Sequence, residues 1–137
     1  MTGVTTAPRD RERLLRCAAS VWGGARVALG VVAMTAPTRV ARPWIGSDAD
    51  TVGGLVFARA LGGRDIALGG GVMYAALRGE RVRPWALAGG FADLGDVVVT
   101  GLYRDELPTG RRAFIAALAG GSALAAIALA CADSNEG

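Results

Sequence analysis

The chain has 137 residues, of which 52% are hydrophobic, and its 15 arginines and 12 acidic residues leave a formal net charge of +3. This small, evenly distributed charge argues against a nucleic-acid partner. The absence of histidine excludes a Ser-His-Asp or Cys-His catalytic group. Cys17 and Cys131 form no CxxC pair, so we expect no metal ion, and no motif indicates a cofactor.

The first apolar segment follows a short charged stretch. Residues 1–12 are polar and are predicted to form a mobile N-terminal tail. Residues 14–35 are predicted to form the first helix, which ends at Ala36-Pro37 because proline cannot continue the helical hydrogen bonding. A cleaved signal peptide is the alternative interpretation of this region, but Arg26 interrupts its apolar core.

A polar connection is predicted between the first and second helices. Residues 36–51 contain four charged residues and the pair Pro43-Trp44. A tryptophan in this position is typical of an anchor at the membrane interface, and Thr51 can cap the next helix. The second helix is predicted over residues 52–78.

Two more apolar segments, residues 85–104 and 112–132, are predicted to form the third and fourth helices. All four segments reach the length of about 20 residues that crosses roughly 30 Å of hydrocarbon, and short connections favour antiparallel neighbours. We therefore predict an all-α fold, a four-helix antiparallel transmembrane bundle over residues 13–132, with a polar tail at 133–137. A soluble bundle is the alternative, but it would have to bury nearly every face of four apolar helices.

The distribution of arginines predicts an orientation in the membrane. The N-terminal stretch and the turn over residues 78–83 together contain seven arginines, whereas the two connections at the opposite end contain five. Because cytoplasmic loops carry more arginine than external ones, we expect a multi-pass protein of the cell membrane with cytoplasmic termini.

Glycine pairs occur in all four apolar segments. They are Gly23-Gly24, Gly62-Gly63, Gly89-Gly90 and Gly120-Gly121. Small residues allow helix backbones to approach closely inside a bilayer. Residues 23–30 and 62–69 also share the pattern Gly-Gly-x-x-x-Ala-Leu-Gly, for which duplication and chance in a glycine-rich chain are equally good explanations.

Ionisable side chains interrupt three of the four apolar segments. They are Arg26, Arg59, Arg64, Asp65, Asp93 and Asp96. An isolated charge at the bilayer centre costs about 2.5–3.5 kcal/mol or more, so we expect these residues to pair. The prediction is an arginine–aspartate network that joins the first three helices and is enclosed by Gly120-Gly121-Ser122 of the fourth.

The network can fix the register of the helices or form a functional site, because ionisable residues inside a membrane are candidates for function. Asp93 and Asp96 are three residues apart and project to one side of a helix, and either carboxyl group could hold a proton and act as a general acid. The catalytic candidates are Asp93, Asp96, Asp65 and Arg64. The binding candidates are Arg26, Arg59 and Arg64.

A resemblance is carried by the stretch from Ala58 to Gly69, the Arg78-Gly79 turn, Trp85, and Ala92-Asp93 with Asp96. The chain resembles a family of small bacterial and fungal integral membrane proteins of unknown function. The similarity rests on an Arg-x-x-Gly-x-Arg-Asp pattern followed by an aspartate-containing helix, and it covers roughly residues 52–103. The resemblance implies four helices and no particular activity.

The leading functional hypothesis is a non-enzymatic accessory or interaction protein that packs against a larger membrane complex or a second copy of itself. The alternative is a membrane-embedded enzyme acting on an apolar metabolite, with Asp93 or Asp96 as the general acid. A minor alternative is proton-coupled transport. The expected partners are the lipid bilayer, a homo-oligomer or larger complex, and an apolar small molecule, with no nucleic acid.

Overall fold

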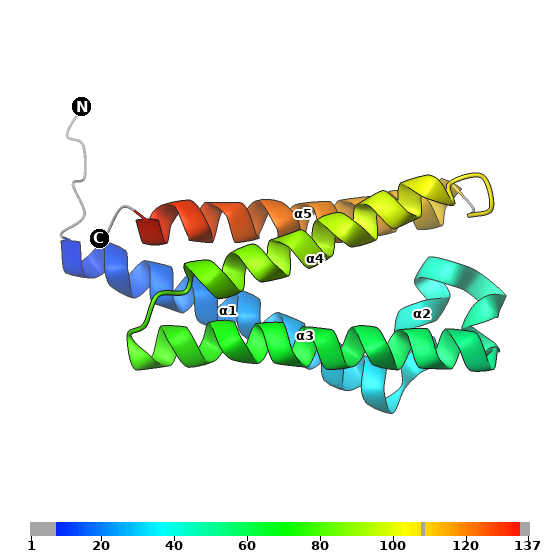
Figure 1. The fold of residues 1–137 in the computed structure, drawn as a ribbon, viewed down its shortest axis with the longest axis horizontal. Helices are drawn as coiled ribbons and strands as arrows, with labels where there is room; N and C mark the ends of the chain where they lie inside the picture. The colour runs from blue at the N-terminus through cyan, green and yellow to red at the C-terminus, as the bar shows by residue number, and fades with distance from the viewer. Residues whose placement is uncertain (1–7, 108, 135–137) are drawn as a thin grey trace.

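The computed structural model describes residues 8–107 and 109–134. These residues form helices and no strand, so the all-α prediction is confirmed (Figure 1). The elements are α1 (Pro8–Thr35), α2 (Pro37–Ile45), the 3-10 helix η1 (Gly46–Asp50), α3 (Val52–Arg78), α4 (Arg83–Leu102) and α5 (Thr109–Ser134).

The first helix begins earlier than the sequence pattern indicated. Residues 8–12 of the predicted tail belong to α1, while residues 1–7 and 135–137 of the two predicted tails lie outside the described residues. The charges at positions 9–13 suit a helix surface, because side chains four residues apart are neighbours there. Glu12 and Arg16 form such a pair, with Oε1 and Nη2 2.6 Å apart.

The predicted connection over residues 36–51 is also structured, which corrects the sequence interpretation. Pro37 occupies the first turn of α2, where its missing N–H costs no hydrogen bond, so this proline starts a helix as well as ending one. Ala41 and Trp44 are buried on one face of α2, whereas Arg39 and Arg42 are exposed. Amphipathicity over nine residues therefore holds α2 against the bundle.

The long helices pair as two hairpins. α1 packs along α3, and α4 packs along α5. The first turn of α1, the last turn of α5 and the connection between α3 and α4 lie at one end of the molecule, whereas α2 and the connection between α4 and α5 lie at the other (Figure 1). Gly79, with φ of 74°, ends α3 in the left-handed conformation that glycine adopts without strain.

Glycines bring α1 and α3 into direct backbone contact. A Cβ atom on Gly30 would lie 2.6 Å from the carbonyl oxygen of Gly62, and one on Gly62 would lie 2.8 Å from that of Gly30. About two helical turns along the same interface, a Cβ atom on Gly23 would lie 2.7 Å from the carbonyl oxygen of Gly69. The similar segments 23–30 and 62–69 therefore face each other in antiparallel register, each end glycine opposite an end glycine.

The hairpin of α4 and α5 is closed by a hydrogen bond between the start of α4 and the end of α5. Oδ2 of Asp133, near the end of α5, accepts a hydrogen bond of 3.0 Å from the backbone N–H of Arg83 at the start of α4. The first N–H groups of a helix have no partner within the helix, so this carboxylate satisfies one of them. Midway along the pair, Gly90 of α4 packs against Ala126 of α5. A Cβ atom on Gly90 would lie 2.9 Å from the Cβ atom of Ala126.

Three helices are long and apolar enough to cross a membrane: Arg9–Thr35, Arg83–Leu102 and Thr109–Asp133. α3 is as long as these but is not one of them, and the charged pair Arg64-Asp65 lies at its centre. Large apolar side chains cover the outside of the molecule, and Phe91 on α4 is 80% exposed. This many exposed large apolar side chains is unusual for a soluble monomer.

Close packing of α1 on α3 predicts different outcomes at two adjacent glycines. Gly62→Ala should lower the free energy of unfolding by about 1–3 kcal/mol, because the new methyl group overlaps the backbone of α1. Gly63→Ala should leave stability equal or slightly higher, because nothing lies within 4 Å of its Cβ position and alanine favours helix. Thermal unfolding in detergent micelles measures both, and equal effects of the two substitutions would contradict the proposed contact.

Candidate functional site: an arginine–aspartate cluster beside a cavity

Arg26 of α1 is bound by carboxylates from two other helices. Nη2 donates to Oδ1 of Asp65 on α3 at 2.7 Å, and Nη1 donates to both oxygens of Asp93 on α4, at 2.8 and 2.7 Å. All three side chains are buried. Arg26 and Asp65 occupy the same position, three residues after the first glycine, in the two similar segments, so the antiparallel glycine contact brings them together.

Arg64 on α3 forms a second ion pair with α4. Its Nη1 and Nη2 donate to Oδ1 and Oδ2 of Asp96, both at 2.9 Å, which is the two-bond geometry that guanidinium and carboxylate groups favour. Nη2 also lies 3.4 Å from Oδ1 of Asp65. Asp65 therefore accepts from both arginines on a single oxygen, while Asp93 and Asp96 each bind one arginine with two.

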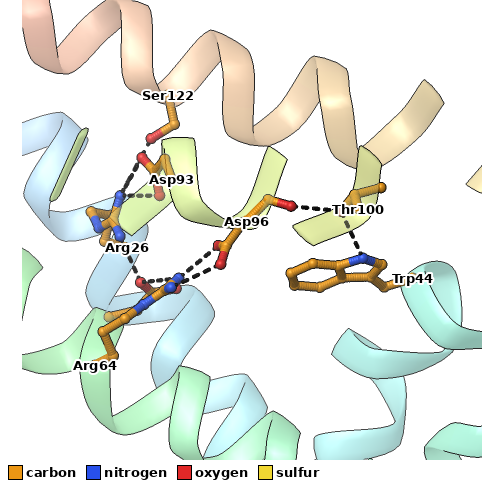
Figure 2. A network of polar contacts seen from close by, with 8 residues as sticks. Arg26, Trp44, Arg64, Asp93, Asp96, Thr100 and Ser122 are labelled. Carbon is orange, nitrogen blue, oxygen red and sulfur yellow. Dashed lines mark hydrogen bonds and ion pairs between the residues drawn. The ribbon is translucent and has the colours of Figure 1, made fainter. Parts of the chain in front are cut away.

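Neutral polar groups extend the cluster to α5 and α2 (Figure 2). Oγ of Ser122 on α5 accepts from Nη1 of Arg26 at 3.4 Å and from Nε1 of Trp22 at 3.1 Å. On the other side, Nε1 of Trp44 donates to Oγ1 of Thr100 at 3.1 Å. The Thr100 hydroxyl in turn donates to the backbone oxygen of Asp96 at 2.7 Å.

Five of the six predicted ionisable residues meet in this cluster, which we call the Arg/Asp cluster: Arg26, Arg64, Asp65, Asp93 and Asp96. Arg59 does not join it. Ala58, Gly62 and Asp65 share the buried face of α3, and Arg59 lies about 100° away from Ala58. Its side chain is exposed and forms no ion pair within the described residues.

Two tryptophans and a threonine belong to the site although the sequence did not assign them to it. Trp44, predicted to be an interfacial anchor, is instead buried, with only 8% of its surface exposed, and hydrogen-bonds Thr100. The ring of Trp22 lies under Arg26, with 5.1 Å between the ring centroid and Cζ. No spacing rule links these residues, because each comes from a different helix.

A cavity of about 730 Å³ lies beside the Arg/Asp cluster. Its walls are mainly apolar side chains from α1, α2 and α5, and the charged residues form one side of it. The apolar lining residues at its exposed rim are Leu29, Val32, Phe114 and Leu118. The volume and the combination of an apolar wall with a few polar groups are typical of small-molecule sites.

The cluster carries an uncompensated formal charge. When all five side chains are ionised, the two arginines contribute +2 and the three aspartates −3. The cluster, as the described residues form it, then has a net charge of −1. The fully buried polar side-chain atoms without a hydrogen-bond partner there are Nε of Arg26 and Nε of Arg64. Among the same residues, no group of three or more histidine, cysteine, aspartate or glutamate side chains could hold a metal ion.

Comparison with known proteins adds no assignment. No family model, no curated protein and no solved structure matches the chain.

Removing the central arginine should be far more damaging than removing the exposed one. Arg26→Gln leaves Asp65 and Asp93 buried beside a neutral side chain, and breaking a buried pair in this way costs about 3–5 kcal/mol. Arg59→Gln, the same substitution at an exposed position, should leave stability unchanged. Thermal unfolding of both variants in one detergent tests this, and a stable Arg26→Gln protein would show that the buried ion pairs do not maintain the fold.

Proposed function

We propose that the chain is a multi-pass protein of the cell membrane in which α3 crosses the bilayer together with α1, α4 and α5, as a four-helix antiparallel bundle. The support for α3 is that its central charges turn inward: Asp65 is buried, and Arg64 pairs with Asp96. Lipid would then contact its remaining, mostly apolar face. The arginine distribution supports an orientation with cytoplasmic termini.

This membrane assignment has a direct test. Apolar side chains on the outside of the bundle should keep the chain in the membrane pellet after extraction at alkaline pH, and release should require detergent. A soluble helical protein carried through the same fractionation is the control. Recovery of the chain in the aqueous fraction without detergent would refute the proposal.

Within the membrane, the geometry best supports binding of an apolar small molecule. The observation that carries this proposal is the cavity of about 730 Å³, lined by apolar side chains and bordered by the Arg/Asp cluster. Because its rim consists of exposed apolar residues of α1 and α5, a ligand dissolved in the hydrocarbon could enter from the side. The polar groups at the inner wall would orient it.

An accessory protein that packs against a larger complex or a second copy stays an alternative. Its support is the apolar, glycine-containing outer surface, where Gly63, Gly70 and Gly95 have open space around them. A surface of that kind serves lipid contact equally well. The cavity is the more specific feature, so ligand binding is the better supported function.

The enzyme alternative, with Asp93 or Asp96 as the general acid, has less support from the geometry than ligand binding. Asp93 and Asp96 each accept hydrogen bonds from an arginine on both carboxylate oxygens, so their side chains are held away from a substrate more firmly than that of Asp65. Asp65 is the better placed candidate, because only its Oδ1 is engaged. Proton-coupled transport would depend on the same side chain. Both ideas require a ligand in the cavity, and so they extend the binding proposal.

Filling the cavity should abolish binding of a neutral apolar probe. N-phenyl-1-naphthylamine accepts excitation energy from tryptophan, and Trp22 and Trp44 both line the cavity. We expect saturable energy transfer to this probe in the wild-type protein. Gly121→Phe should weaken it by about tenfold or more, because Gly121 lines the cavity and its Cβ position is open.

The control is Gly120→Phe. The neighbouring glycine also has open space at its Cβ position but does not line the cavity. Wild-type affinity is expected for this variant. Equal weakening by both substitutions, or no saturable transfer in the wild-type protein, would refute a ligand site in the cavity.

A further inference from the structure

The excess negative charge of the Arg/Asp cluster belongs to one residue. Arg26 with Asp93 and Arg64 with Asp96 make two neutral pairs, with shortest N–O distances of 2.7 and 2.9 Å. Asp65 is the third carboxylate, and it shares the arginines of these two pairs, at 2.7 Å from Nη2 of Arg26 and 3.4 Å from Nη2 of Arg64. A net charge held at this depth in a bilayer is costly. Neutralisation requires either a proton on the cluster or a positive group in the adjoining cavity.

One oxygen of Asp65 is free to meet such a group. Both arginines donate to Oδ1, and Oδ2 accepts no hydrogen bond from the described residues. The Asp65 side chain is only 10% exposed and lines the cavity. Among the described residues, the fully buried side-chain atoms without a hydrogen-bond partner are Nε of Arg26 and Nε of Arg64. Oδ2 of Asp65 also has no partner but is not one of these atoms, so part of its surface is accessible. A buried acceptor without a donor is a position that a ligand can complete.

The rest of the cavity suits a cation with an apolar body. The indole rings of Trp22 and Trp44 line it, and aromatic faces attract organic cations. The unpartnered Nε atoms of Arg26 and Arg64 would suit an anion, but both are fully buried and out of reach of a ligand. Arg39 also lines the cavity, on α2 at one end of the bundle, where its exposed charge is screened by solvent.

From this arrangement we infer that the cavity binds a lipophilic organic monocation whose positive centre is neutralised by Asp65. The inference rests on the proposed function and specifies its ligand class: an apolar body in the space between α1 and α5, with a protonated amine or similar cationic group at Oδ2 of Asp65. The two neutral arginine–aspartate pairs hold that carboxylate in place and are not themselves exchanged.

Two ions of the same shape and opposite charge test the inference. Tetraphenylphosphonium and tetraphenylborate should be compared by equilibrium dialysis against the full chain in micelles, with protein-free micelles subtracted. We expect saturable binding of the phosphonium ion and none of the borate ion. Asp65→Asn should weaken phosphonium binding by about tenfold or more, since it removes the excess negative charge of the Arg/Asp cluster. Asp65→Glu should keep it.

Two controls separate this inference from the proposed function. Asp105→Asn, the same substitution at an exposed residue outside the cavity, should bind the phosphonium ion as the wild type does. Asp65→Asn should keep the cooperative thermal unfolding of the wild type in the same micelles, which shows that the variant is folded, and binding of neutral N-phenyl-1-naphthylamine by the wild type reports on the cavity independently. Equal phosphonium binding by wild type and Asp65→Asn, or preferential binding of tetraphenylborate, overturns the inference while leaving the cavity as a site for neutral ligands.

Discussion

The guanidinium group of Arg26 links the two halves of the molecule. α1 and α4 make no close backbone approach in the described part of the chain, yet Arg26 reaches from one to the other and binds Asp93 at 2.7 Å. The long side chain of Arg26 joins α1 to α4 across a separation between the two helix backbones that small apolar side chains could not bridge. Ion pairing thus connects the hairpins while keeping them apart, and the cavity occupies the space that remains.

The closeness of α1 and α3 has its origin in the sequence of these two helices. Glycines at both ends of two similar eight-residue segments bring one pair of backbones into contact. That contact places Arg26 opposite Asp65, its counterpart in the other segment, at 2.7 Å. The sequence alone did not decide whether the similarity of the two segments has a meaning. In the antiparallel register, equivalent positions of the two segments hold an arginine and an aspartate, which form an ion pair.

Features that depend on residues within one helix could be predicted from the sequence, whereas most contacts between residues of several helices could not. Apolar length and the cost of buried charge predicted the all-α fold and the meeting of Arg26, Arg64 and the aspartates. Arg59 was misassigned because depth in the membrane was considered without the helical face. The cavity was not predicted, since it arises from side chains on several helices whose relative positions no local pattern encodes. Trp44 was placed at the interface for the same reason, as its partner Thr100 lies 56 residues away.

The charge count bears on whether the cluster exists only to fix the helices in register. Two arginine–aspartate pairs would be enough to connect α1 and α3 with α4, and asparagine at position 65 could still accept a hydrogen bond from each arginine. A third carboxylate adds a charge whose burial is costly and whose second oxygen no described residue uses. A purely structural role leaves that second oxygen without a partner. A ligand that brings a compensating charge would supply that partner, and Asp65 lines the cavity.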